Sequence, residues 1–239
     1  MPPTAAPALT TIAPGVKQVT VGERAMSQVY LLDHPDGPVA FDAGVRGTGQ
    51  AVLDAAGAPL SRVVLSHSHI DHRGGANELG APVFCHPDEV ADVKGDAGAS
   101  YTDFGLIRNP VVREAMPKLL ALWDGGPVDV AGTVAAGDDV AGFEVIHLPG
   151  HAPGQIALFR HGDRLLLAAD SIYTIDMEAG RPGAPRVPHP ATSWDTEMAR
   201  ASIRRLIGLE PASVFTGHAG HFDTDVARQL EAAASFSYA

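Results

Sequence analysis

Short apolar segments separated by turn residues dominate the first part of the chain. Residues 16–21 alternate apolar and polar side chains, residues 28–32 are mostly apolar, and residues 38–42 follow a Pro-Asp-Gly turn. Such runs between turn signals are typical of β-strands, so we expect three short antiparallel strands here. The Pro- and Ala-rich residues 1–14 predict a loose N-terminal lead-in.

Helical spacing and short apolar runs then alternate along the chain. Helices are predicted where apolar residues recur at helical spacing between cap signals, at residues 48–56, 109–123, 195–206 and 223–233. Further strands are predicted from short apolar runs at residues 62–66, 82–85, 143–147, 155–159, 164–168 and 214–216. We expect Asn109 to cap the second helix and Ser193 the third. The Pro/Gly-rich residues 176–190 are not expected to form one regular element.

Composition narrows the class of protein. The 239 residues carry a formal charge of −11, and an acidic chain lacks the clustered cations that bind nucleic acid. No apolar run is long enough to span a membrane, and no basic segment precedes an apolar one as in a secretory signal. The single cysteine, Cys85, excludes an intrachain disulfide and a four-cysteine zinc site. We therefore expect a cytoplasmic protein that binds neither nucleic acid nor membrane.

Histidines gather in the sequence SHSHIDHRGG, residues 66–75. His67 and His69 follow a predicted strand at a spacing of two, so their side chains project together, and Asp71 and His72 follow in the turn. Imidazole and carboxylate are ligands that Zn²⁺ accepts. Three His and one Asp at these spacings rarely arise by chance, which disfavours the alternative of a solvated polar turn.

Three more candidate ligands lie at or just past the ends of later strands. His151 follows FEVIH within HLPGHAPG, Asp170 ends LLLAAD, and His218 follows VFTG. A carboxylate at the end of a buried strand needs a strong partner, and a metal would supply it. His221 is the alternative to His218, but His218 directly follows the strand. Five His and two Asp are enough for two metal ions that share one carboxylate.

The motifs HSHIDH, LPGHAPG, LLLAAD and FTGHAG, in this order, resemble the metallo-β-lactamase-fold superfamily from about Ser27 to His221. The resemblance implies an α/β fold, a four-layer αββα sandwich of two mixed β-sheets with outer helices, as a single domain over residues 1–239. It implies that one metal ion is held by His67, His69 and His151. It implies a second metal ion held by Asp71, His72 and His218, with Asp170 bridging the two. Asp42 matches a supporting position, although a turn-forming Asp before Gly44 is an equal alternative.

The cofactors implied by the resemblance are two divalent transition metal ions. Zn²⁺ is the first expectation, and Fe or Mn also suits His and Asp ligands. The other histidines are expected to have no ligand role. His86 and His147 are expected to be structural, whereas His34, His161 and His189 are expected to be solvated.

Tyr173 lies three residues after Asp170 and matches the Asp-x-x-Tyr pattern of N-acyl homoserine lactonase-like members. This resemblance implies a hydrolase that uses a metal-bridging hydroxide to cleave a small lactone or ester. Tyr173 would donate a hydrogen bond to the carbonyl or leaving oxygen, and Asp71 would shuttle a proton. The alternative for Tyr173 is packing beside the Pro-rich loop.

Two other functions stay open at this stage. One is a thioesterase or tailoring hydrolase of a carrier-bound or polyketide-type intermediate, and the other is an inactive metal-binding accessory protein. Residues 94–127 and 174–192 are expected to line a pocket for a small-molecule substrate with an apolar part. The alternative is that their apolar side chains only seal the edge of the sandwich. The sequence does not specify the oligomeric state.

Overall fold

The computed structural model describes residues 8–22 and 27–238. Its internal contacts divide into two compact units. The first unit holds the chain up to residue 98 together with residues 119–134, and the second holds residues 99–118 and the chain from residue 135 onward. No helix in the described ranges is long and apolar enough to cross a membrane. That one domain spans the chain stays a prediction.

A seven-stranded mixed sheet forms the body of the first unit, with its strands in chain order. Neighbouring strands are antiparallel from β1 to β4 and parallel from β4 to β7. The strands are β1 (Ala8–Ala13), β2 (Val16–Val21), β3 (Ser27–Leu32), β4 (Val39–Phe41), β5 (Arg62–Val64), β6 (Val83–Cys85) and β7 (Val130–Thr133). The three antiparallel strands predicted at the start of the chain are confirmed as β2, β3 and β4.

The prediction of a loose lead-in is wrong for Ala8–Ala13. These residues form edge strand β1, which pairs antiparallel with β2 and has an irregularity between Thr11 and Ala13. The first four residues of β1 are exposed, so the segment has no buried face that would produce an apolar pattern. Main-chain pairing with β2 therefore makes this strand. Residues 1–7, also part of the predicted lead-in, lie outside the described residues.

Short helices complete the first unit. They are α1 (Gly49–Ala56), α2 (Ile70–Arg73) and α3 (Val90–Val93), with the 3₁₀ turns η2 (Ala76–Glu78) and η3 (Pro87–Glu89). As predicted, α1 ends at Ala56, and the next residue, Gly57, adopts the left-handed conformation at φ 70°. Val52 of α1 belongs to the same core as Val63 of β5 and Cys85 of β6. This packing makes the end of β5, from which the histidine motif starts, a rigid support.

A six-stranded sheet and a separate hairpin form the second unit. The sheet order is β15-β14-β11-β10-β9-β8, and β12 pairs with β13. The strands are β8 (Asp139–Val140), β9 (Phe143–His147), β10 (Ile156–Arg160), β11 (Leu165–Ala169), β12 (Tyr173–Asp176), β13 (Arg181–Arg186), β14 (Ser213–Thr216) and β15 (His221–Phe222). Three 3₁₀ turns belong to this unit: η4 (Ala99–Tyr101), η5 (Phe104–Leu106) and η6 (Pro190–Thr192).

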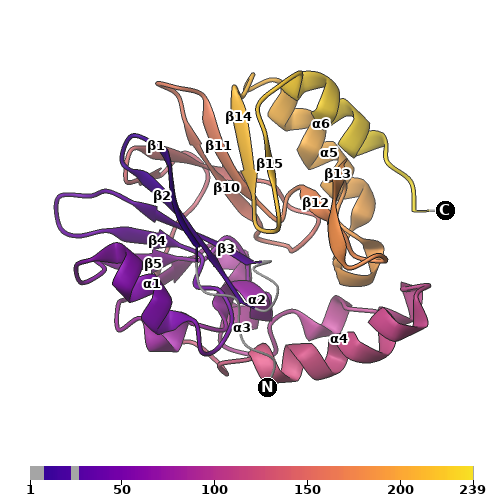
Figure 1. The fold of residues 1–239 in the computed structure, drawn as a ribbon, viewed down its shortest axis with the longest axis horizontal. Coiled ribbons are helices and arrows are strands. Elements are labelled where there is room, and N and C mark those ends of the chain that lie inside the picture. The colour runs from indigo at the N-terminus through magenta and orange to yellow at the C-terminus, as the bar shows by residue number, and fades with distance from the viewer. Residues whose placement is uncertain (1–7, 23–26, 239) are drawn as a thin grey trace. The chain divides into compact units, whose positions relative to one another are not determined.

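Two helices of the second unit, α5 (Thr196–Ile207) and α6 (Val226–Ser235), lie side by side (Figure 1). Ile203 and Leu206 of α5 share a core with Leu230 of α6. Helix α4 (Pro110–Trp123) begins in the second unit and ends in the first. The predicted cap of α4 is present, because Asn109 Oδ1 accepts the amide of Val111 at 3.0 Å.

Two local predictions in the second unit need correction. Asp195, not Ser193, caps α5, since its Oδ1 atom accepts the amide of Met198 at 2.9 Å. The Pro/Gly-rich residues 176–190 do not form one regular element, as predicted, but they include strand β13, which the sequence analysis missed. Two of its six residues are proline, and pairing with β12 holds it extended.

Candidate metal centre

Three imidazoles of the first unit lie against one another just beyond β5. The ring of His67 lies 4.6 Å from that of His69 and 4.3 Å from that of His72, measured between ring centroids. His69 is the N-cap of α2, so the single turn of this helix carries His72 back toward His67. Asp71 lies in the same turn and is half-buried. The structure thus brings together the three histidines that the motif predicted.

A buried carboxylate orients two of these rings. Asp42 accepts the amide of Ser66 at 2.7 Å and the Ser66 hydroxyl at 2.8 Å, and it lies 2.8 Å from Nδ1 of His72. The Ser66 hydroxyl lies 2.9 Å from Nδ1 of His67. Because the Ser66 proton goes to Asp42, the Nδ1–H of His67 donates to Ser66. Both imidazoles then present the Nε2 lone pair, which is the form a metal ligand needs. These contacts favour the supporting role for Asp42.

Sequence reasoning missed two buried ionisable groups near this motif. Glu89 is fully buried and accepts the amide of Ser68, the residue between His67 and His69, at 2.7 Å. Arg73 is also buried and donates to the Val93 carbonyl at 2.6 Å. Burial lowers the pKa of the Arg73 guanidinium, and Asp124 opposes this shift. In the sequence, Glu89 and Arg73 are charged residues beside short apolar segments. That pattern does not show which groups they contact.

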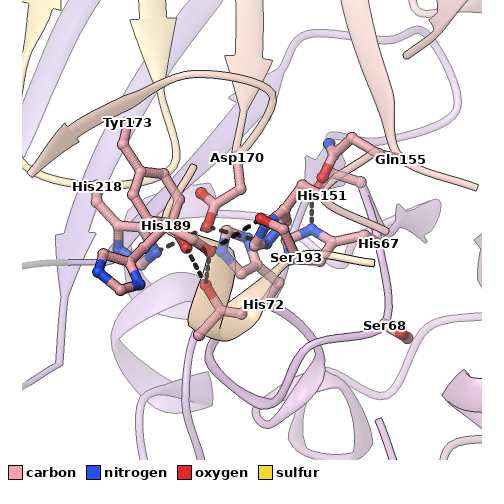
Figure 2. A network of polar contacts seen from close by, with 12 residues as sticks. His67, Ser68, His72, His151, Gln155, Asp170, Tyr173, His189, Ser193 and His218 are labelled. Atoms are coloured by element: carbon pink, nitrogen blue, oxygen red, sulfur yellow. Dashed lines mark hydrogen bonds and ion pairs between the residues drawn. The ribbon is translucent and has the colours of Figure 1, made fainter. Parts of the chain in front are cut away.

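Asp170 of the second unit faces two histidines. Its Oδ2 atom lies 3.1 Å from Nε2 of His218 and 3.6 Å from Nε2 of His151 (Figure 2). Asp170 directly follows β11, where the pairing with β14 shifts register between Leu167 and Ala169. A register shift of this kind bends the strand and redirects the side chains that follow it.

The spacing of these donors fits metal coordination. Two donor atoms that each lie about 2.1 Å from one tetrahedral metal are separated by about 3.4 Å. The two distances from Asp170 Oδ2, 3.1 and 3.6 Å, lie on either side of that value. All three side chains are buried, and a buried carboxylate requires a cationic or hydrogen-bonding partner. The His and Asp clusters of both units therefore suit divalent metal ions.

A glycine places His151. Gly150 has φ 138°, and a Cβ at this position would lie 2.1 Å from the backbone nitrogen of Ala199 in α5. Only glycine allows the turn to approach the helix this closely. The amide of Trp194 donates to the His151 carbonyl at 3.0 Å. The Pro-Gly turn thus fixes the backbone of a predicted ligand against α5.

His218 and His221 lie in different surroundings, and the choice of His218 as a ligand stays a prediction. The hydroxyls of Thr174 and Thr216 lie 2.6 and 2.8 Å from the His218 carbonyl and hold its turn in place. The side chain of His221 is exposed on β15 and stacks on the Phe215 ring at 4.7 Å, with 6° between the ring planes. Placement directly after the strand was the signal in the sequence that separated the two histidines.

Tyr173 begins β12 and is buried beside two predicted ligands. Its ring centroid lies 5.6 Å from that of His151 and 5.9 Å from that of His218. Its hydroxyl lies 3.2 Å from Oγ1 of Thr192, and Figure 2 shows the ring near Asp170 and His218. Tyr173 therefore lies next to the donor set of its own unit.

The expectation that His189 is solvated is wrong. Its side chain is 3% exposed and lies 3.5 Å from Glu178. Burial lowers the pKa of His189, while Glu178 raises it. The Pro-rich segment around His189 suggested an exposed loop, but that segment packs in the second unit. The expectation holds for His161, which is 67% exposed beside Glu144.

The two histidines that were expected to be structural make local contacts. His86 caps η3, because its Nδ1 atom accepts the amide of Asp88 at 3.3 Å. Nε2 of His147 lies 3.0 Å from the carbonyl of Pro153. Cys85 is a buried free cysteine, and burial raises the pKa of its thiol to about 12.

Two segments predicted to line a substrate pocket contact each other within the second unit. The Glu178 carboxylate accepts the amides of Arg108 and Asn109, each at 2.8 Å. The amide of Asp103 donates to the Ala191 carbonyl at 2.9 Å. The loop before α4 is therefore tied to the β12–β13 hairpin and to η6. That they line a pocket stays a prediction.

Comparison with known proteins gives consistent matches. A profile of the Metallo-beta-lactamase superfamily matches residues 22–218. The probable metallo-hydrolase YflN of Bacillus subtilis is 30% identical over 234 residues, which cover 86% of this chain and 84% of YflN. The Homo sapiens acyl-coenzyme A thioesterase MBLAC2 is 28% identical over 145 residues, covering 56% of this chain and 48% of MBLAC2. The crystal structure of TTHA1623 in a di-iron-bound form aligns with a TM-score of 0.64 and 25% identity, covering 88% and 96% of the two chains.

The mixed sheets with helices and the His/Asp clusters at strand ends define an α/β metal-binding protein of the metallo-hydrolase type. The chain belongs to the metallo-beta-lactamase superfamily. Its fold is the metallo-beta-lactamase fold, as the sequence predicted.

Proposed function

We propose that this chain is a dinuclear metal-dependent hydrolase that cleaves a small lactone or ester. The observation that carries the proposal is the position of Asp170 Oδ2 between the Nε2 atoms of His218 and His151, at 3.1 and 3.6 Å. The di-iron-bound form of the similar protein TTHA1623 supports a dinuclear site.

Seven side chains are the metal ligands in this proposal. His67, His69 and His151 hold one metal ion. Asp71, His72 and His218 hold the other, and Asp170 bridges them. Zn²⁺ is our first expectation for the metal, and Fe or Mn suits the same donors.

The residues of the chain have distinct roles in the proposed reaction. When bound, the metal ions act as Lewis acids and lower the pKa of a coordinated water toward neutrality. Asp42 and Ser66 keep His72 and His67 in the tautomer that presents Nε2. The Tyr173 hydroxyl donates to the leaving oxygen, and Asp71 accepts and returns a proton.

The similarity to acyl-coenzyme A thioesterase MBLAC2 favours a thioester substrate as the second candidate. The two candidate substrates differ in whether the leaving group needs a proton from Tyr173. An alkoxide leaving group needs a proton, whereas a thiolate, the anion of a more acidic group, departs without one. The placement of Tyr173 beside His151 and His218 favours an oxygen leaving group.

A substrate panel with metal analysis tests the proposal. Lactones, alkyl esters, thioesters and cephalosporins are compared by kcat/KM, with matched acyl groups where the chemistry allows. Metal content is measured on the same sample. We expect about two metal equivalents and the highest kcat/KM on a lactone or alkyl ester. Highest kcat/KM on the thioester would favour the second candidate. Bound metal without turnover of any substrate would favour an accessory protein.

A further inference from the structure

The hydroxyl of Tyr173 faces a side chain that the proposed reaction does not yet use. Thr192, the last residue of η6, places Oγ1 3.2 Å from the Tyr173 oxygen. Both side chains are almost completely buried. The same Oγ1 atom lies 3.2 Å from the carbonyl oxygen of His189. A carbonyl only accepts, so the Thr192 hydroxyl either donates to His189 while it accepts from Tyr173, or donates to the Tyr173 oxygen itself. In the second arrangement the Tyr173 oxygen accepts from Thr192, and the phenol proton can be donated to a leaving oxygen.

The turn that carries Thr192 is held in place by several contacts. Nδ1 of His189 accepts the amide of Ala191 at 3.1 Å, and its ring packs on Tyr238 at 4.4 Å between centroids. The Ser193 hydroxyl donates to the His189 carbonyl at 3.0 Å. Glu178 lies 3.5 Å from the other ring nitrogen of His189. Because the turn is fixed at both ends, its threonine oxygen is a fixed point for the phenol.

We propose that Thr192 is a positioning residue that fixes the Tyr173 hydroxyl for proton donation. This inference rests on the proposed function, in which Tyr173 donates to the leaving oxygen. Thr192 does not touch the substrate. It holds the phenol oxygen in one place, and it donates to that oxygen while the phenol proton moves to the leaving group.

The proton transfer balances within the hydrolysis. The Tyr173 O–H bond breaks as its proton forms an O–H bond with the leaving alkoxide. The Thr192 hydroxyl has turned from the His189 carbonyl to the Tyr173 oxygen when the proton leaves, and it stabilises the phenolate that forms. The proton released when water adds to the substrate carbonyl restores the phenol. No oxidant or further reactant is required.

Two substitutions at Thr192 separate the hydroxyl from the shape of the side chain. Thr192→Val keeps the shape and removes the hydroxyl, and Thr192→Ser keeps the hydroxyl. We expect Thr192→Val to lower kcat on an alkyl ester about tenfold, the contribution of one oriented hydrogen bond. KM, metal content and kcat on an activated aryl ester should stay at wild-type values. Thr192→Ser should restore kcat. Thr133→Val, at an exposed position of β7, is the control for the chemical change.

A double variant tests whether the two residues act together. A spectroscopic measurement adds a readout that does not depend on activity. If the two residues act together, Tyr173→Phe with Thr192→Val is no slower than Tyr173→Phe alone. The resonance Raman Fermi doublet of tyrosine reports the hydrogen bond of the phenol. Its Tyr173 component, taken as the difference from Tyr173→Phe, should change in Thr192→Val and return in Thr192→Ser.

The outcomes distinguish this inference from the proposed function. Wild-type kcat in Thr192→Val, with a slow Tyr173→Phe, would overturn the role of Thr192 and leave that of Tyr173 intact. An unchanged Raman doublet in Thr192→Val would overturn it as well. Wild-type kcat in Tyr173→Phe on the alkyl ester would remove the acid role from the proposed function, and with it the role of Thr192.

Discussion

The carboxylate of Asp42 lies 2.8 Å from Nδ1 of His72, and each of these side chains is 1% exposed. Its remaining contacts go to the amide and hydroxyl of Ser66, and that hydroxyl reaches His67. One buried carboxylate therefore orients two neighbouring imidazoles, one directly and one through a hydroxyl. Ligand orientation is a large part of metal affinity, so Asp42 should control how tightly His67 and His72 bind a metal ion.

Asp42→Asn tests this relationship. An amide has one oxygen acceptor and an NH₂ donor, so it cannot accept from both Ser66 and His72 as the carboxylate does. We expect metal affinity, measured by competition with a chromogenic chelator, to fall about 10- to 100-fold. Asp36→Asn changes a carboxylate that is 84% exposed and should leave affinity unchanged. Wild-type affinity in Asp42→Asn would return Asp42 to a turn-forming role.

Asp170→Ala tests the bridging assignment. A carboxylate shared by two metal ions serves both, so its loss should lower metal content from about two equivalents to well under that value after dialysis. Activity should fall with it. Asp223→Ala, at an exposed position after β15, is the matched control. Full metal content together with full activity in Asp170→Ala would contradict the bridge.

His218 and His221 form a natural matched pair of variants. His218→Ala should lose the second metal ion and most activity, because its Nε2 atom faces Asp170 at 3.1 Å. His221→Ala removes an exposed ring that stacks on Phe215 and should change the rate only modestly. Metal content and kcat are measured on both. The opposite order of effects would move the ligand to His221.

Tyr173→Phe removes only the hydroxyl of a buried ring that packs on His151 and His218. If the phenol protonates the leaving group, kcat on an unactivated lactone should fall about 10- to 1,000-fold. Metal content should not change, and activated aryl esters should be affected less. An unchanged kcat on the lactone would assign Tyr173 a packing role.

The parts of the site that the sequence predicted are those encoded over a few residues. His67 and His69 share a strand end at a spacing of two, and His72 follows within one helical turn. Asp170 could be placed because LLLAAD shows where a buried strand ends. Such relationships depend on local backbone geometry, which the order of residues determines. The apolar runs and cap signals of the main strands and helices are local in the same sense.

The parts that the sequence could not predict depend on long-range packing. Glu89 accepts from Ser68 across 21 positions, and Thr192 meets Tyr173 across 19. No periodicity connects such pairs, so the sequence shows two polar residues without their contact. The cap of α5 was misassigned for the same reason, since the Ser193 hydroxyl is used to hold the His189 carbonyl.

Because His189 is buried, the free energy of unfolding of the second unit should depend on pH. Burial lowers the pKa of His189 from its ordinary value of 6.5, against the opposing effect of Glu178. Burial raises the pKa of Glu178, but the amides of Arg108 and Asn109 outweigh this and leave it below 4.5. Both groups therefore bind protons more readily in the unfolded chain than in the folded one. The His189 contribution is complete above about pH 6.5 and is lost as pH falls toward the folded pKa. Glu178 adds a loss in the same direction at lower pH.

His189→Asn tests this pH dependence. The Asn oxygen can accept the Ala191 amide as Nδ1 of His189 does, but the side chain does not titrate. We expect the urea midpoint to fall less between about pH 7.5 and pH 5.5 in His189→Asn than in the wild type. His161→Asn changes a histidine that is 67% exposed and should follow the wild type. Metal loading is kept equal in all samples. Metal release at low pH then contributes equally to the pH dependence of the urea midpoint in each protein. Equal slopes in His189→Asn and the wild type would show that His189 does not change its protonation on unfolding in this range.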